Sequence, residues 1–290
     1  MRRRVWVIAG LGGLSFVLLT TMACATAQAA EGVAGQLISG PAQPTLMAAQ
    51  PVAGGPSCAN PTPAMAAECQ ALTERILAST VRLEFHGPCG GIGHATVMGG
   101  RYLVTHNHYP VTGEALSRGG DGLIAAVSVL KANGDIILLK APLTYFNVAL
   151  IAPEALVLDF HEYGGVGFFD SVDVPSVEAG LLTDMNIQPG SEVAQVDWDL
   201  TSTRVTWTRV TAVGEADGTP YLELDSYVEQ GASGGGVFYN GVHVANNWSR
   251  NTDCVAATGE VVRHYSLAAL NSGSIVALER GAPEVVLVGQ

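Results

Sequence analysis

A glycine-rich segment around one serine is the part of this chain best suited to covalent chemistry. Four glycines accompany Ser233 in the segment 230–237, Gln-Gly-Ala-Ser-Gly-Gly-Gly-Val. Glycine allows backbone angles and close approaches that can turn several N–H groups toward one ligand. Acyl transfer requires such donors beside a nucleophilic hydroxyl, where they stabilise the oxyanion. Because glycine is also common in ordinary loops, the segment predicts catalysis only together with a base elsewhere in the chain.

Two histidines at the end of a predicted strand supply the candidate base. The runs 93–98 and 101–105, joined by a Gly-Gly turn, predict a β-hairpin that leads directly into His106 and His108. A histidine at a strand end is held rigidly, and its pKa near neutral suits a general base. A structural strand-end histidine is the alternative interpretation.

Both segments resemble motifs of the chymotrypsin-like (trypsin-like) serine proteases. The run 100–108, Gly-Arg-Tyr-Leu-Val-Thr-His-Asn-His, is similar to the strand that ends in the catalytic histidine of that family. The segment 231–235 is similar to the family's segment around the catalytic serine, and the chain order, histidine before serine, also agrees. Residues 72–85 resemble the helix-then-strand start of the HtrA-type protease domain, here without room for a PDZ domain. The resemblance covers about 65–255.

The resemblance implies an all-β fold of two six-stranded antiparallel Greek-key β-barrels. The first barrel would span about 80–160 and the second about 190–265, within a protease domain at 63–290. Apolar periodicity from 63 to about 79 adds a short helix before the first barrel. A second short helix, near the C-terminus, is an option at 266–270 or 275–280.

The same resemblance assigns catalytic roles. His108 would be the base, because the family keeps two residues between a threonine and its catalytic histidine, and His106 would pack beside it. Ser233 would be the nucleophile. The backbone N–H groups of Gly231 and Ser233 would form the oxyanion hole.

Four positions compete for the place of the triad acid, and one of them, Asn147 before the apolar run 148–150, would fit a weakened or inactive site. Asp135 is the first choice, because the run 135–140, Asp-Ile-Ile-Leu-Leu-Lys, resembles the family's segment around its catalytic aspartate. Local chemistry competes, because the preceding Asn-Gly pair is favoured in a tight hairpin turn, and Asp135 would then only follow that turn. Glu154 and Asp159, which flank a later apolar run, are the rivals.

Substrate-binding residues also follow from the resemblance. Tyr227 stands where a trypsin-like pocket has an aspartate, so a preference for Arg or Lys is not expected. Ala245 and Asn246 lie in the run 241–247, which resembles the strand that borders the substrate cleft. Ala232 replaces the aspartate that captures a new N-terminus in pancreatic-type enzymes, so activation by that route is not expected.

Composition and charge restrict the partners. The chain is 48% hydrophobic and 14% charged, so it can form a sizeable core. A formal net charge of -12 without a basic stripe argues against a nucleic-acid partner. Asp197 and Asp199 share one face of a predicted strand, which we interpret as a solvated face and not as a metal site. We therefore expect a monomer that acts on peptides or proteins, without metal or cofactor.

The first 29 residues have the pattern of an export signal. Three arginines precede the apolar stretch 5–19, and Ala-Gln-Ala at 27–29 fits a cleavage site. An uncleaved membrane anchor and a poor lipoprotein box at 21–24 are the alternatives. Residues 30–62, rich in Ala, Gly and Pro, predict a flexible linker.

The cysteines agree with export. After the signal the chain retains an even number of them, as disulfides in an oxidising compartment require, and their pairing is left open: Cys58, Cys69, Cys89 and Cys254.

These features predict a secreted or extracytoplasmic serine endopeptidase that works through an acyl-enzyme. A catalytically impaired protease-fold protein that binds peptides or a partner is the alternative. The segment 231–235 also fits the nucleophile elbow of α/β-hydrolases. Those enzymes place their histidine well after the serine, whereas only about 57 residues follow Ser233 here.

Overall fold

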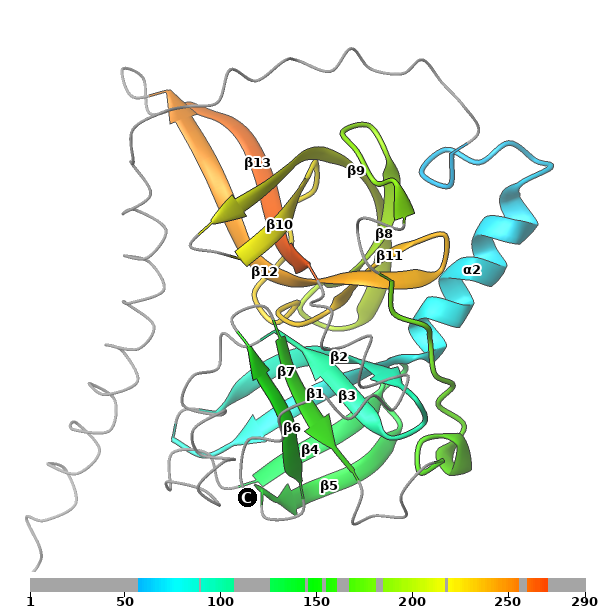
Figure 1. Cartoon of the computed structure of the whole chain (residues 1–290), viewed down its shortest axis with the longest axis vertical. Coiled ribbons are helices and arrows are strands. Elements are labelled where there is room, and N and C mark those ends of the chain that lie inside the picture. The colour runs from blue at the N-terminus through cyan, green and yellow to red at the C-terminus, as the bar shows by residue number, and fades with distance from the viewer. Residues whose placement is uncertain are drawn as a thin grey trace, which may run out of the picture. The chain divides into compact units, whose positions relative to one another are not determined.

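The computed structural model describes residues 57–88, 90–106, 126–143, 146–152, 155–160, 167–180, 185–216, 219–255 and 260–270 (Figure 1). Two antiparallel sheets account for most of these residues. The helical elements that the structure describes in full are α2 (Ala66–Ala78) and the short 3₁₀ helix η3 (Asp170–Val172).

The first sheet has seven strands in the order β5-β4-β1-β2-β3-β7-β6. Their bounds are β1 (Thr80–His86), β2 (Gly91–Met98), β3 (Tyr102–Thr105), β4 (Ala126–Lys131), β5 (Ile136–Pro142), β6 (Asn147–Ala152) and β7 (Ala155–Asp159).

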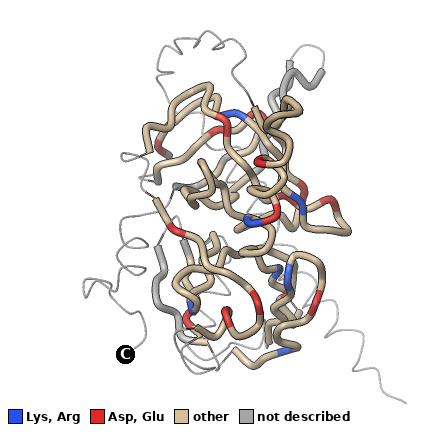
Figure 2. Tube along the Cα trace, turned by 90° about the vertical axis from the view of Figure 1, so that its right-hand side faces the viewer, with Lys and Arg blue, Asp and Glu red and all other residues tan. Residues whose placement is uncertain are grey.

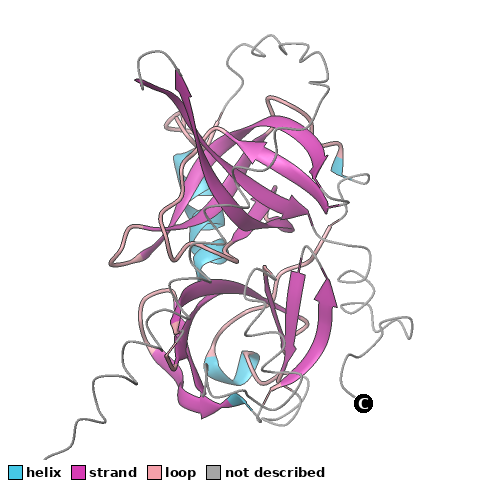
Figure 3. Ribbon diagram, turned by 90° about the vertical axis from the view of Figure 1, so that its left-hand side faces the viewer, coloured by secondary structure: helices cyan, strands magenta, loops and turns pink. Residues whose placement is uncertain are grey.

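The second sheet closes into a six-stranded barrel in the order β10-β13-β12-β11-β8-β9 (Figure 3). Its strands are β8 (Glu192–Trp198), β9 (Thr203–Ala216), β10 (Thr219–Leu224), β11 (Gly236–Tyr239), β12 (Val242–Val255) and β13 (Glu260–Leu270). Closure pairs both edges of most strands, which removes exposed backbone groups.

The hairpins of the first sheet follow from their turn residues. Gly99 and Gly100, at φ 57° and 68°, join β2 to β3, and Gly134, at φ 93°, lies in the turn between β4 and β5. Tight hairpin turns, and three-residue hairpin loops that end in a left-handed residue, favour such angles, which glycine adopts without strain from a Cβ. The hairpins predicted around these glycines are therefore present.

Each sheet encloses its own apolar core. Val81, Leu83, Val97 and Leu103 are fully buried in the first core, where Phe160 also packs against neighbouring aromatic rings. In the second core the largest fully buried side chains are those of Leu222 and Leu224 from β10.

Helix α2 packs on the second barrel. Its Ile76 is fully buried in a cluster with Val196 of β8 and Phe238 of β11. The indole N–H of Trp207 on β9 donates to the hydroxyl of Thr73 at 3.1 Å. The helix lies inside the range 63–79 in which apolar periodicity predicts one.

The fold confirms the predicted all-β architecture of two antiparallel β units, of which the second is a closed barrel, and it corrects two details. The first sheet has seven strands instead of six, because β6 and β7 form an additional hairpin in which Ala152 pairs with Ala155. The segment 266–270 is part of β13 and not a helix, because β10 and β12 pair with it on both sides. The other option for that helix, 275–280, lies outside the described residues.

Charge is sparse along the described chain, and Lys and Arg do not gather in one stretch of the trace (Figure 2). Among the described residues, no helix is long and apolar enough to cross a membrane. The predicted signal and most of the predicted linker lie outside the described residues.

Candidate active site

Residues 229–235, which hold the serine expected to be the nucleophile and are called the nucleophile loop for that reason, form two consecutive tight turns. In the first, the Ala232 N–H donates to the Glu229 carbonyl at 3.1 Å, and in the second the Gly235 N–H donates to the Ala232 carbonyl at 2.9 Å. The third residue of each turn is a glycine, Gly231 at φ 103° and Gly234 at φ 76°. Turns with positive φ at this position require glycine, which explains the motif. Half-buried Ser233 occupies the corner of the second turn.

Three consecutive carbonyls of this loop are held by donors from fixed strands. The Gly231 carbonyl accepts from Nδ1 of His94 at 2.8 Å, and the Ser233 carbonyl accepts from the His94 backbone N–H at 2.8 Å. The Ala232 carbonyl accepts from Nδ2 of Asn247 at 3.0 Å. Each bond contributes roughly 0.5–1.5 kcal/mol. The loop is therefore fixed by β2 on one side and β12 on the other.

Gly231 has one polar group left for a ligand. Its carbonyl is bound by His94, and a Cβ on Gly231 would lie 2.8 Å from Cδ1 of Trp198, so the indole occupies its side-chain position. Within the described residues, the Gly231 N–H donates to no acceptor. An N–H in a rigid turn beside a serine can stabilise an oxyanion.

Gly234 lets the nucleophile loop approach the first sheet closely. A Cβ on Gly234 would overlap the Thr105 hydroxyl and lie 2.5 Å from the His94 carbonyl oxygen. That carbonyl accepts a hydrogen bond from the Thr105 hydroxyl at 2.8 Å. The last residue of β3 is thus packed directly against the residue that follows Ser233.

A buried polar network supports the loop from below. Oδ1 of Asn247 accepts from Nε2 of Gln195 at 2.7 Å, and the same nitrogen donates to the Ser266 hydroxyl at 3.0 Å. The Ser226 hydroxyl donates to Oε1 of Gln195 at 2.5 Å. Because these groups are paired, their burial carries little desolvation penalty, and the network fixes the amide of Asn247.

His94 is a neutral, fully buried imidazole in this structure. Its Nδ1 faces a carbonyl oxygen and must donate, so Nε2 accepts from the Thr203 hydroxyl at 2.9 Å. Desolvation lowers the pKa of His94 to about 4, with a smaller opposing effect of the bond to Gly231. The ring also lies against Trp198, with 5.7 Å between centroids.

The predicted base lies outside the described residues, which end before it at His106 and resume at Ala126. His106 itself is buried and stacks on Trp248 of β12, with centroids 5.8 Å apart and planes 22° apart. This is the packing position that the sequence predicts for it. His108 follows two residues after His106, beyond the end of β3.

Asp159 lies at the other end of β3. It pairs with Tyr102, the first residue of that strand, and Arg101 binds its carboxylate through both Nε (2.7 Å to Oδ1) and Nη2. Thr105 lies three residues further along the strand, a distance of about 10 Å. Asp159 and its ion-pair partner Arg101 therefore lie at the start of β3, whereas the chain continues to His108 from the end of β3.

Asp135 is exposed in the β4–β5 hairpin, where its backbone carbonyl accepts from the Lys131 N–H at 2.8 Å. Lys131 pairs with Val81 of β1, and Val81 pairs with Ala95 of β2. The hairpin thus extends past Ala95 toward the turn 99–100, where β3 begins. This register places Asp135, too, away from the end of β3 that continues to His108.

Glu154 lies outside the described residues, but it directly precedes Ala155, the first residue of β7. In β7, Leu156 pairs with Thr105, the last residue of β3. The start of β7 and the end of β3 therefore lie side by side.

The predicted substrate-binding residues have different surroundings. Tyr227 is 36% exposed in the segment before the nucleophile loop and is accessible to a ligand. Ala245 and Asn246 are fully buried, and each pairs with β11 on one side and β13 on the other. Neither side chain can contact a substrate without rearrangement of the second barrel. β12 continues beyond its last pairing with β11, through Trp248, so any strand-like contact with a substrate would begin there.

The predicted solvated face of β8 is only half correct. Asp199 is exposed and accepts from Thr201 and Ser202, which lowers its pKa. Asp197 is buried and accepts from Arg204, with 2.6 Å between Nη2 and Oδ2. The guanidinium compensates the buried negative charge, which would otherwise be unpaired. In the described part of the chain, no three His, Cys, Asp or Glu side chains converge on a metal site.

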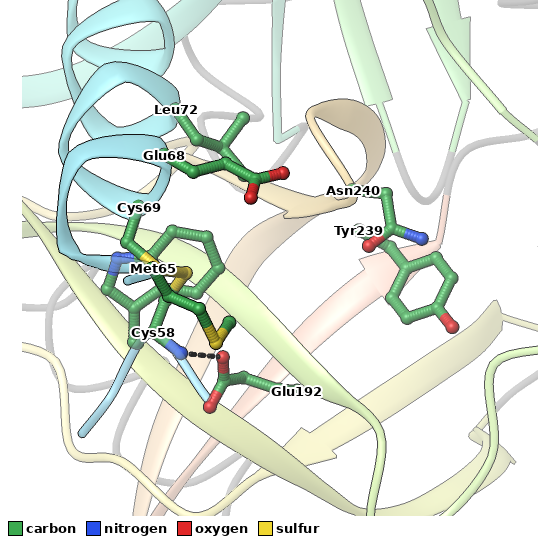
Figure 4. A pocket seen from close by; sticks show the side chains of 9 residues that line it. Cys58, Met65, Glu68, Cys69, Leu72, Glu192, Tyr239 and Asn240 are labelled. Carbon is green, nitrogen blue, oxygen red and sulfur yellow. Dashed lines mark hydrogen bonds between the residues drawn. A yellow bond between two sulfur atoms is a disulfide. The ribbon is translucent and has the colours of Figure 1, made fainter. Parts of the chain in front are cut away.

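A hollow of about 310 Å³ lies beside α2 (Figure 4). The Cys58–Cys69 disulfide, with Cα atoms 5.4 Å apart, forms part of its wall, and a carboxylate oxygen of Glu192 accepts from the Cys58 N–H at 2.6 Å. None of the predicted site residues lines this hollow. Cys89 lies outside the described residues, and the disulfide shows one of the pairings that the sequence left open.

Sequence reasoning missed the hydrogen bonds that His94 and Asn247 make with the nucleophile loop. Their only signal was a polar residue inside an otherwise apolar strand, in Gly-His-Ala-Thr-Val and Val-Ala-Asn-Asn-Trp. Their partners lie 137 and 15 residues away, so no local pattern could identify the contacts.

Comparison with known proteins supports the fold. A structure of the HtrA-type protease AlgW with a tripeptide matches with TM-score 0.50 and 17% identity, over 72% of this chain and 61% of that chain. An AlgW variant with a tripeptide gives TM-score 0.50 and 15% identity, over 73% and 62% of the two chains. Deg5 matches with TM-score 0.49 and 17% identity, over 66% of this chain and 88% of its own.

This chain thus spans about three fifths of the AlgW chains that it matches. A comparison with protein-family models finds no match, and neither does a comparison with curated proteins. Identities of 15–17% support conclusions about architecture and not about activity. The chain has the two-barrel fold of the trypsin-like serine proteases.

Proposed function

We propose that this protein is a serine endopeptidase that hydrolyses peptide bonds through an acyl-enzyme. The observation that carries the proposal is the nucleophile loop, in which Ser233 stands at the corner of a rigid turn and the Gly231 N–H is left for a ligand. The Ser233 hydroxyl would attack the peptide carbonyl, and the N–H groups of Gly231 and Ser233 would bind the oxyanion. His108 would accept the serine proton and pass it to the leaving amine.

We propose Glu154 as the acid that orients His108. Asp135 was the first choice from sequence, but the strand register favours Glu154, because β7 begins beside the end of β3. A glutamate can hold the imidazole tautomer as an aspartate does, provided that it reaches Nδ1.

A matched pair of variants tests this assignment. Glu154→Gln should lower kcat by about 10⁴, as loss of the triad carboxylate does elsewhere. Asp135→Asn should keep wild-type kcat. If Asp135→Asn loses activity and Glu154→Gln does not, the assignment is wrong and the motif resemblance was the better guide.

Peptidase activity itself is tested by cleavage of a mixed library of unmodified peptides, with products identified by mass spectrometry. The full chain should cleave peptides, and Ser233→Ala should lose that activity by several orders of magnitude. Ser171→Ala is the matched control, because Ser171 is exposed in η3 and its hydroxyl donates to the Phe168 carbonyl of the same turn. Equal cleavage by Ser233→Ala and wild type would refute the proposal. Tight binding of a peptide without cleavage would support the alternative, a peptide-binding protein.

We further propose that the protein is exported, with residues 1–29 removed. The Cys58–Cys69 disulfide supports this proposal, because disulfides persist in oxidising compartments. N-terminal sequencing of the protein recovered outside the cytoplasm should begin at residue 30. Recovery of the intact N-terminus in the membrane fraction would show that the segment is an anchor instead.

A further inference from the structure

His94 connects the two sheets at the nucleophile loop. It belongs to β2 of the first sheet, yet both ring nitrogens bind residues of the second barrel, Gly231 and Thr203. Its backbone N–H binds the carbonyl of Ser233. His94 therefore holds two carbonyls of the loop, those of Gly231 and Ser233.

The five residues from Gly231 to Gly235 carry no ionic side chain. Ala232 is fully buried and carries only a methyl group. The peptide between Gly231 and Ala232 is held at its N–H by the Glu229 carbonyl and at its carbonyl oxygen by the His94 ring. Glycine is free to adopt other backbone angles, so without that donor the buried carbonyl would turn toward another partner.

We propose that His94 is a positioning residue of the active site: its neutral imidazole donates from Nδ1 to the Gly231 carbonyl, which fixes the peptide after Gly231 and, through the shared α-carbon, keeps the preceding peptide with its N–H directed at the oxyanion. The inference rests on the proposed peptidase function. The Gly231 carbonyl can only accept, so it keeps the proton on Nδ1, and the Thr203 hydroxyl donates to Nε2. The indole ring of Trp198 limits movement of Gly231 in one further direction, because it occupies the space where a Gly231 side chain would lie. The oxyanion site is thus formed before substrate binds.

Two amide variants separate the donor from the packing of the ring. In His94→Asn, the side-chain amide nitrogen takes the place of Nδ1 and can still donate to Gly231. In His94→Gln, the amide lies at the distance of Nε2 and faces Thr203. Both variants lose the ring and leave one amide in the same buried site, so the loss of packing is similar.

The expected result is a difference in kcat and not in KM. His94→Gln should lower kcat by about 10², the scale of losing an oxyanion donor. His94→Asn should stay within about threefold of wild type, because the hydrogen bond to the carbonyl is kept. Thr208→Val is the control for substitution of a buried residue on β9, because the Thr208 hydroxyl has no hydrogen-bond partner in the described chain. Equal kcat for His94→Asn and His94→Gln would overturn the proposal.

A second measurement does not depend on activity. In the Ser233→Ala background, His94→Gln should accelerate amide hydrogen exchange across residues 229–235 by about tenfold or more, whereas His94→Asn should not. Unchanged exchange in both variants would overturn the positioning role. If wild type cleaves no peptide while the exchange difference is present, the proposed function fails and the positioning role stands.

Discussion

Gly234→Ala perturbs the contact that brings β3 against the nucleophile loop. The residue has φ 76°, which an L side chain adopts only with strain of about 1–2 kcal/mol. Its new Cβ would overlap the Thr105 hydroxyl and lie 2.5 Å from the His94 carbonyl oxygen. Overpacking of this kind adds about 1–3 kcal/mol. We therefore expect a loss of about 2–5 kcal/mol in the free energy of unfolding.

Two other glycines separate the strain from the clash. Gly134 has φ 93° and open space where a Cβ would lie, so Gly134→Ala should cost only the strain, about 1–2 kcal/mol. Gly91 has open space and no left-handed φ, so Gly91→Ala should stabilise the protein by about 0.4–1 kcal/mol through the unfolded state.

Urea unfolding at pH 7 measures all three variants, with stability taken from the midpoint at a common m-value. Removal of the overlapping hydroxyl in the double variant Gly234→Ala/Thr105→Ala should recover part of the loss. If Gly234→Ala costs no more than Gly134→Ala, the close approach of β3 to the nucleophile loop is not as described.

Three further predictions concern the buried groups that hold the fold. Burial lowers the pKa of His94 to about 4 and of His243 to about 3, so the unfolded state binds more protons below pH 6.5 and stability falls as the pH drops. Between pH 7 and pH 5, each histidine should lower the free energy of unfolding, measured with urea, by about 2 kcal/mol. His243→Gln should remove about half of this pH dependence. A free energy of unfolding that does not change with pH would contradict the neutral burial of the two histidines. Replacing Cys58 and Cys69 together by Ala opens a loop with a sequence separation of 11 and should cost about 3 kcal/mol, whereas an unchanged melting temperature under reducing conditions would show that the disulfide contributes nothing. Asn247→Asp removes the amide that donates to the Val196 and Ala232 carbonyls and should destabilise by about 3 kcal/mol at pH 7; an unchanged stability would mean that water replaces that donor.

Sequence patterns predicted the parts of the site that depend on local backbone chemistry. The Gly-Gly and Asn-Gly turns determine the β2–β3 and β4–β5 hairpins, and the glycines around Ser233 determine the two turns of the nucleophile loop. The order of these elements, together with a family resemblance, was enough to predict a two-barrel fold.

Contacts between distant segments could not be predicted in the same way. The run 266–270, Ser-Leu-Ala-Ala-Leu, consists largely of good helix formers, yet pairing with β10 and β12 places it in a strand. Asp197 alternates like a solvated residue, and only the position of Arg204 across the β8–β9 pair shows why it is buried.

The choice of acid shows the same limit. Asp135 stands in a run that resembles the family's segment. The pairing register of the strands, however, determines which end of the first sheet a residue occupies, and the residues of a hairpin turn do not reveal that register. The pairing of Leu156 with Thr105 provides this information, and it favours Glu154.

The most direct test of an acyl-transfer site at Ser233 is covalent labelling of the full chain with a fluorophosphonate, followed by peptide mass mapping. A preformed nucleophile loop with a working base should give one adduct per chain, on Ser233, and none in His108→Ala. Absence of an adduct on Ser233, under conditions where a control serine protease is fully labelled, would contradict the account.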